Sequence, residues 1–151
     1  MSLFDVFTIA GSALEAQSVR LNLTASNMAN ANNVAGSAQE AYRARQPYFA
    51  PLLKDALAST NGNDVAAAGV RTLGVLENPA PPPRLYQPGQ ALADKDGDVY
   101  GSNVNPIDEL VNMISASRSY QNNVEVLNTS KELLLRTLML LMAQGWRDQD
   151  D

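Results

Sequence analysis

The feature that most constrains this sequence is its last long segment, residues 105–144, which contains one proline at its second position and no glycine. Asn105 can cap free N–H groups, and Pro106 fits the first position of a helix. Asp108 adds negative charge to the first turn. The next glycine is Gly145, so the segment predicts a helix of about 39 residues and about 58 Å. An average globular helix is about a third as long.

Apolar residues recur along this segment at a strict spacing of seven. They are Met113, Tyr120, Leu127, Leu134 and Leu141, with Val124 and Leu138 on the intermediate row. A sustained seven-residue repeat is typical of a helix that supercoils against another helix. The pattern also fits a long amphipathic helix in an ordinary bundle, so periodicity alone leaves both interpretations open.

The polar positions of the same segment are filled mainly by Asn and Ser. Between positions 110 and 130 only Arg118 and Glu125 are charged. A solvated helix face usually carries Lys and Glu, whereas Asn and Ser are poor helix formers. The composition therefore predicts faces that meet other protein through short polar contacts, or a helix that is poorly ordered alone. Both hold if the helix orders on assembly.

The first segment, residues 3–31, is a compositional twin of the last. Its seven-residue repeat consists of Phe7, Leu14, Leu21 and Met28. If the two helices pair, they are antiparallel because the chain must return. Apolar or small residues lie on more than one face of each helix, so one pairing leaves apolar surface exposed. That surface calls for further copies of the same or similar chains, and a repeating contact that does not close builds a ring or a tube.

The composition of the whole chain narrows the classes of function. The 151 residues suit about one domain, and the net charge of −5 disfavours nucleic acid and acidic membranes as partners. Cysteine and histidine are both absent. Their absence removes thiolate chemistry and the commonest general base and zinc ligand. No cofactor, metal, catalytic set or small-molecule substrate is expected.

The beginning of the chain does not resemble a Sec signal peptide. The first basic residue is Arg20, so the basic region that opens such peptides is missing. No uninterrupted apolar run approaches the ~18 residues of a membrane span. We expect neither a cleaved signal peptide nor a span.

The middle of the chain is rich in turn residues and is typical of a small irregular β region of four short strands. We predict a strand over 42–46 that Pro47 ends, a continuation over 48–53 that Pro51 interrupts, and strands at 70–76 and 84–86, with a loop over 55–69. The predicted fold is mainly α with a small β insertion: two long, antiparallel, coiled-coil terminal helices and a β-rich middle domain. The divisions are a helix over 1–33, the insertion over 34–104, a helix over 105–145 and an acidic tail over 146–151.

The acidic run at 94–98 resembles the start of a calcium loop. The motif requires a Glu six residues after its Gly, and that position holds Asn103. The favoured interpretation is a turn centred on Asp-Gly and followed by a strand at 99–100. If the chain were an enzyme acting through carboxylates, on peptidoglycan for example, the candidates would be Glu40, Asp94, Asp96 and Asp98.

Two stretches carry a resemblance to a known family. Residues 9–14, 20–22 and 25–30 (IAGSAL, RLN and ASNMAN) and residues 108–129 (DELVNMISASRSYQNNVEVLNT) are similar to the paired terminal signatures of bacterial flagellar rod and hook proteins. Residues 42–44 and 86–94 also fit, and the short length favours a member from the proximal rod. The resemblance covers both terminal helices closely and the middle loosely.

The resemblance implies a structural role. Members of this family are exported unfolded by the flagellar type III apparatus without a cleaved signal peptide, and assemble with other copies and other rod proteins into a tubular shaft. That shaft crosses the periplasm and transmits torque from motor to hook. The implied assembly residues are Phe7, Leu14, Leu21, Asn22, Asn27, Met28, Asn30, Met113, Arg118, Tyr120, Asn122, Val124, Leu127, Asn128, Leu134, Leu138 and Leu141. Among them, the Asn residues and Arg118 are expected to form hydrogen bonds between helices.

A different interpretation of the residues is a self-contained helical binding or adaptor module. It predicts a cooperative monomer whose helix content does not rise on association. A polymerising subunit instead predicts terminal helices that are weakly ordered alone and gain order with partners.

Overall fold

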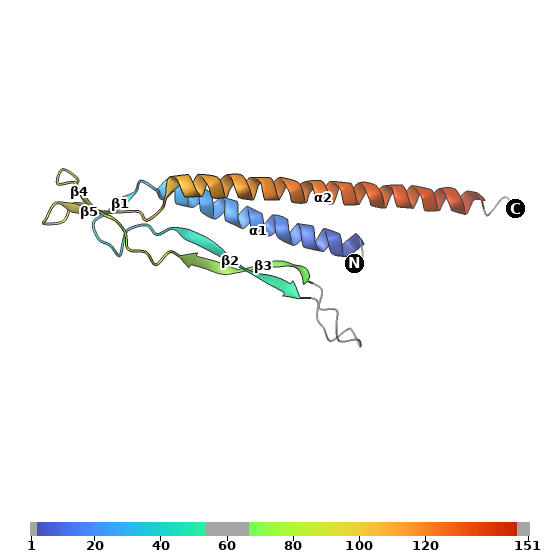
Figure 1. The fold of residues 1–151 in the computed structure, drawn as a ribbon, viewed down its shortest axis with the longest axis horizontal. Coiled ribbons are helices and arrows are strands. Elements are labelled where there is room, and N and C mark those ends of the chain that lie inside the picture. The colour runs from blue at the N-terminus through green and yellow to red at the C-terminus, as the bar shows by residue number, and fades with distance from the viewer. Residues whose placement is uncertain (1–2, 54–66, 148–151) are drawn as a thin grey trace.

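The structure is a computed structural model that describes residues 3–53 and 67–147. Figure 1 shows an elongated molecule in which two helices lie side by side, α1 (Leu3–Asn30) and α2 (Pro106–Arg147). They run in opposite directions, and α2 extends well beyond the start of α1. The predicted layout of two helices around a small β region is confirmed. Supercoiling of the helices stays a prediction.

The helix α2 begins as its sequence predicts. Asn105 Oδ1 accepts the Ile107 N–H at 3.0 Å, and Asn105 Nδ2 donates to Asp108 Oδ2 at 2.9 Å. The helix does not stop at Gly145 but continues to Arg147. A single glycine costs a helix about 1 kcal/mol relative to alanine, which weakens the helix without breaking it. Only the last four residues of the expected acidic tail lie outside the described residues.

The described residues of the middle of the chain form five strands in two separate sheets, so the expectation of four short strands is wrong. β1 (Val34–Ala35), β4 (Arg84–Tyr86) and β5 (Asp98–Gly101) form an antiparallel sheet in the order β1-β5-β4. β2 (Arg45–Leu53) and β3 (Ala67–Glu77) form an antiparallel ribbon of 9 and 11 residues. The strands expected at 70–76, 84–86 and 99–100 are confirmed. The loop expected over 55–69 lies largely outside the described residues, and β3 includes its last positions.

Proline does not interrupt the first long strand, contrary to the prediction. β2 begins at Arg45 and runs through Pro47 and Pro51, which pair with Val75 and Val70. A two-stranded ribbon has only edge strands, in which a residue without an N–H is tolerated when its nitrogen faces away from the partner. The two prolines are four positions apart and therefore face the same side of the strand.

The ribbon lies along α1 on the side away from α2 (Figure 1). Ser12 Oγ donates to Ile9 O at 2.8 Å and accepts the Val70 N–H at 3.1 Å, which ties β3 to the helix. Next to Val70, Gly69 has a φ of 142°, and a Cβ there would overlap the Ser12 hydroxyl. The close approach of strand and helix therefore requires glycine at this position.

Small residues form most of the core between the helices. Ala10, Ala16 and Ala116 are almost fully buried. The larger apolar residues of the seven-residue repeats are only partly buried or are exposed. Small side chains let the helix backbones approach closely but remove little apolar area from water. The chain therefore folds around a thin core and leaves much of its apolar surface uncovered.

Candidate assembly surface

A polar joint holds the end of α1 to the start of the ribbon. Asn27, which is only 1% exposed, donates from Nδ2 to Arg45 O at 2.8 Å. Its Oδ1 accepts the Arg45 N–H at 2.9 Å and the Tyr42 hydroxyl at 3.0 Å. Buried amides are costly unless they are paired, and this side chain is well paired within its own chain. Within the chain these bonds go to residues 42 and 45 and not to the other helix, and a role of Asn27 between chains stays a prediction.

A second asparagine extends this joint toward the start of α2. Asn103 Oδ1 accepts the Ala44 N–H at 2.7 Å, and its Nδ2 donates to Ala80 O at 2.8 Å and to Asn78 O at 3.3 Å. One side chain thus satisfies three backbone groups in segments that belong to no strand. We call Asn27, Tyr42, Ala44, Arg45 and Asn103 together the joint.

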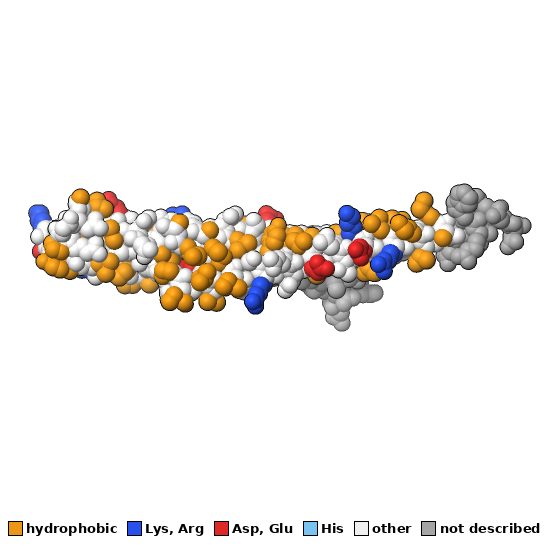
Figure 2. Space-filling view, turned by 90° about the horizontal axis from the view of Figure 1, so that it is seen from above, with side chains coloured by type: hydrophobic (Ala, Val, Ile, Leu, Met, Phe, Trp, Pro, Cys, Tyr) orange, Lys and Arg blue, Asp and Glu red, His pale blue; other side chains and the backbone are white. Residues whose placement is uncertain are grey.

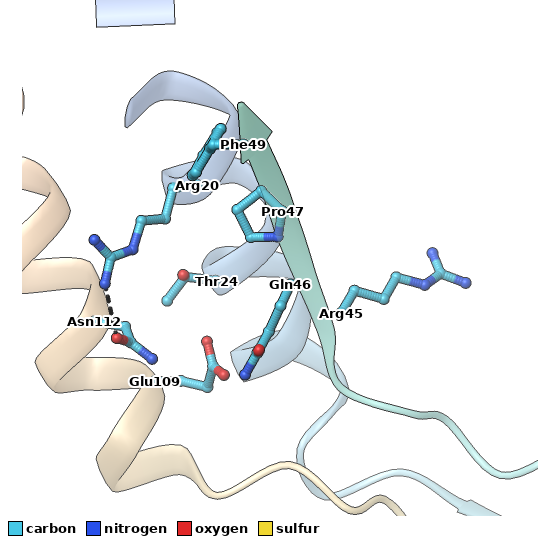
Figure 3. Close-up of a pocket in the computed structure, with 8 residues that line it drawn as sticks. All are labelled: Arg20, Thr24, Arg45, Gln46, Pro47, Phe49, Glu109 and Asn112. Carbon is cyan, nitrogen blue, oxygen red and sulfur yellow. Dashed lines mark hydrogen bonds between the residues drawn. The ribbon is translucent and has the colours of Figure 1, made fainter. Parts of the chain in front are cut away.

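One side-chain hydrogen bond links the two helices directly among the described residues. Arg20 Nη2 donates to Asn112 Oδ1 at 3.0 Å, at the mouth of a cleft of about 340 Å³ between α1, α2 and β2 (Figure 3). Glu109, only 6% exposed, also lines the cleft, whereas Arg45 turns away toward Glu77. The sequence contains Arg20 and Asn112 within the two family signatures, but nothing in the pattern pairs them.

The predicted assembly residues of α1 lie at the borders of its packed face. Phe7, Leu14, Leu21, Met28 and Asn30 are partly buried, and Asn22 is exposed. Asn30 donates to Ser26 O at 2.8 Å within its own helix and accepts from Asn33 Nδ2 at 2.6 Å. This bonding helps to end the helix, so of the three candidate asparagines on α1 only Asn22 has a fully available amide.

The predicted assembly residues of α2 divide in the same way. Met113, Val124, Leu127 and Leu134 are partly buried, and Arg118, Tyr120, Asn122, Asn128, Leu138 and Leu141 are exposed. The exposed polar members have no side-chain partner among the described residues. They are therefore free to meet another chain, which is the role that the resemblance implies.

Exposed apolar side chains cluster at both ends of α2. At its start, Ile107 is 72% and Val111 61% exposed. At its far end α2 outruns α1 (Figure 1), and the apolar positions between Leu133 and Met142, which we call the overhang, are all at least partly exposed. Figure 2 shows this order along α2: hydrophobic side chains, then charged ones, then hydrophobic ones again. Large exposed apolar surfaces of this kind commonly mark sites of contact with other molecules.

The acidic run between β4 and β5 forms a closed turn. Asp94 Oδ1 accepts the N–H groups of Asp96 and Asp98 at 2.9 and 3.0 Å. Arg84 Nη2 lies 2.5 Å from Asp98 Oδ2 and 3.8 Å from Oδ2 of Asp94 and of Asp96. The turn interpretation is confirmed, and the Arg84 guanidinium lies beside the carboxylates that a calcium ion would need.

These contacts shift the titration of one carboxyl group. The N–H of Asp98 is the main cause that holds the pKa of Asp94 below its ordinary value of 3.8, with smaller contributions from Asp96, Arg84 and Gly97. Desolvation of the carboxyl group opposes this lowering only in part. The group is anionic at neutral pH and serves the turn rather than proton transfer.

The described part of the chain contains neither a metal-binding cluster nor a membrane span. Within residues 3–53 and 67–147 no cluster of three or more metal-ligating side chains occurs. Over the same two ranges, no helix is long and apolar enough to cross a membrane.

The surfaces described above lie in segments that match known families. The family described as "Flagella basal body rod protein" matches residues 7–36, and the family described as "Flagellar basal body rod FlgEFG protein C-terminal" matches residues 95–140. The first match covers most of α1. The second covers most of α2, including the start of the helix and most of the overhang.

Whole-chain comparisons give the same result. The flagellar basal-body rod protein FlgC of Yersinia enterocolitica is 51% identical over 140 residues, which is 93% of this chain and 98% of that protein. Proteins of the same name from Salmonella typhimurium and Escherichia coli O6:H1 are each 49% identical with the same coverage. The chain therefore belongs to the FlgC family of flagellar basal-body rod proteins, as a structural subunit and not an enzyme.

Proposed function

We propose that the chain polymerises through its terminal helices, with copies of itself and with other rod proteins, into the tubular proximal rod that transmits torque from motor to hook. The observation that carries this proposal is the overhang of α2. Its exposed apolar residues include Met139 at 68% and Leu141 at 60%, and they lie beyond the reach of α1. A tube of helices would cover them on all sides.

The thin alanine core supports the same proposal. Repeat residues such as Leu14 and Leu127 are only partly buried in the single chain, so their remaining surface is available to helices of neighbouring chains. Seven-residue spacing on both helices favours supercoiled packing in the assembly. A rod built this way would be stiff because each helix packs against several neighbouring helices rather than against one.

Export and location are part of the proposal. The chain reaches the periplasmic rod through the flagellar type III apparatus with its N-terminal segment retained. Intact-mass measurement of the chain from purified basal bodies tests this, and a mass that lacks the first 15 to 30 residues or so, the usual length of a signal peptide, would contradict it.

The assembly proposal is tested with a double variant, Leu138→Glu and Met139→Glu, in cells that lack the natural chain. Charges in the overhang should prevent incorporation into basal bodies and abolish swimming. The matched control is Gln87→Glu and Gln90→Glu, which adds the same two charges at exposed positions outside both helices and should leave assembly intact, because the proposed contacts lie on the terminal helices. Normal basal bodies with the apolar-to-Glu variant would overturn the proposal.

A further inference from the structure

The outer face of α2, opposite α1, has apolar ends and a polar centre. The start patch consists of Ile107, Leu110, Val111 and Ile114, which are 72%, 47%, 61% and 47% exposed. The end patch consists of Leu135, Leu138, Met139 and Met142, which are 44%, 48%, 68% and 70% exposed. Between them the same rows hold seven polar residues and one apolar residue, namely Ser117, Arg118, Gln121, Val124, Glu125, Asn128, Lys131 and Glu132.

The two patches match residue by residue. Leu138 follows Leu110 by 28 residues, and every other member of the end patch follows its counterpart by the same interval. Twenty-eight residues are four heptads, so in a supercoiled helix both patches face the same direction. The same interval separates Arg136 from Asp108, both of which are exposed. When two α2 helices are shifted by 28 residues, the apolar end patch of one helix lies beside the apolar start patch of the other. Arg136 of the first helix then lies near Asp108 of the second.

We propose that the end patch of one copy packs on the start patch of a second copy, with the two α2 helices parallel and displaced by 28 residues, about 42 Å along the axis. This inference rests on the proposed function and names the surfaces that perform it. Each copy uses a different patch toward each neighbour, so the contact leaves a free patch at both ends of every pair. Such a contact does not close and adds copies in one direction.

A single contact of this kind is small. It involves one patch of four residues from each helix. The surface area that such patches can bury is less than the roughly 1,000 Å² that a stable interface usually buries. In the rod it would act together with contacts between neighbouring helices, whereas in solution it forms and breaks. Covalent trapping is therefore a better readout than the size of the particle.

The chain has no cysteine, which makes the trapping experiment clean. In the variant Leu110→Cys/Leu138→Cys the two thiols are about 42 Å apart along one helix, so they cannot form a bond within a chain. Mild oxidation should give a ladder of linked multimers. The control Leu110→Cys/Val126→Cys places the second thiol at another exposed site, 44% accessible, outside the 28-residue interval, and its ladder should be at least tenfold weaker.

Mixing the two single variants sets the direction of the contact. Leu110→Cys and Leu138→Cys chains with different tags should give mixed pairs in preference to pairs of either kind alone. A double variant that stops at dimers would show a closed two-fold pairing, and pairs of identical single variants would show patch-to-same-patch contact. The proposal is overturned if the double variant stops at dimers, if identical single variants pair with each other in preference to mixed pairs, or if no cross-link forms at all.

The same oxidation in purified basal bodies separates this proposal from the proposed function. If the double variant is present in basal bodies but forms no ladder, or links only to a different rod protein, the copy-to-copy contact is wrong and the rod function stands. If the unsubstituted chain is itself absent from basal bodies, the rod function fails. A ladder in basal bodies supports both.

Discussion

The joint, where α1 ends, and the overhang, where α2 ends, lie far apart along the molecule (Figure 1) and differ in whether their groups have partners within the chain. At the joint, Asn27 and Asn103 satisfy backbone groups of segments that come together from distant parts of the sequence. At the overhang, residues such as Met139 and Met142 are 68% and 70% exposed. The polar groups of the joint have partners inside the chain, whereas the apolar groups of the overhang do not.

This difference separates what the chain does alone from what it does in an assembly. Directional hydrogen bonds at the joint fix how the ribbon sits on α1 before any partner arrives. In the proposed assembly, the non-directional apolar surface of the overhang would supply the driving force for association. Substitutions at the joint should therefore lower the stability of the monomer, and substitutions at the overhang should lower assembly only.

The largest effect on the monomer is expected from Asn27→Ala. The change leaves the Arg45 N–H and C=O without their partner in a buried site and should lower the free energy of unfolding by about 3 kcal/mol. Urea denaturation measures it. Asn22→Ala, an exposed asparagine on the same helix, is the matched control and should change the value by less than about 0.5 kcal/mol. Equal losses in the two variants would contradict the role of the joint.

A somewhat smaller loss is expected from Ala116→Leu. Ala116 is 0% exposed between the helices, and extra methyl groups there should push α1 and α2 apart at a cost of about 2 kcal/mol. The same change at the exposed Ser115 should be nearly neutral. Thermal unfolding of the two variants measures the loss of stability. Equal losses would show that the helices are not closely packed at Ala116.

The inter-helix hydrogen bond from Arg20 should contribute less. Asn112→Ala removes the acceptor, while the guanidinium remains at the mouth of an open cleft where water can replace it, so we expect a loss of about 1 kcal/mol. Asn122→Ala, an exposed residue on α2 without a side-chain partner among the described residues, should be silent. A double-mutant cycle with Arg20→Ala should show coupling if the bond in Figure 3 forms in solution.

The turn at Asp94 predicts a small dependence on pH. Its pKa is lower in the folded chain than its ordinary value of 3.8, so its stabilisation is present above about pH 4 and is lost as the pH falls through the lowered value. Comparison of unfolding curves at pH 3 and pH 6 for the natural chain and Asp94→Asn measures it. The difference between the two proteins should shrink at the lower pH, and a difference that grew would contradict this assignment.

The overhang should have the smallest effect on the monomer. Leu138→Glu places a charge on a side chain that is already 48% exposed and should change the free energy of unfolding by less than about 0.5 kcal/mol. In the same variant, incorporation into basal bodies should fall at least tenfold. Destabilisation of the isolated chain would show that Leu138 belongs to the core instead.

Much of the helical part could be predicted from sequence. The cap at Asn105, the lengths of both helices and the strands near Val70 and Val99 all follow local rules of capping, period and turn chemistry. The same rules failed at Pro47 and Pro51, because whether a proline ends a strand depends on which edge its nitrogen faces. That edge is decided by the partner strand, which local sequence does not specify.

The surfaces that remain exposed for other chains were less predictable from the sequence than the helices and strands. Seven-residue spacing identifies candidates such as Leu21 and Leu141, but it does not say which side chains α1 and α2 cover for each other and which remain for a neighbour. Likewise, Asn27 and Asn22 look alike in sequence, yet one is 1% exposed in the joint and the other faces solvent. Long-range pairs such as Arg20 with Asn112 need the fold itself.

The most direct test of the difference between the two ends is amide hydrogen exchange of the purified chain and of the same chain in purified basal bodies. We predict that residues 26–28 and the start of β2 are protected in both samples. Residues 133–142 should exchange rapidly in the isolated chain and become protected in the basal body. Equal protection of residues 133–142 in both samples would mean that the overhang is complete without a partner, which contradicts its role as the surface that drives assembly.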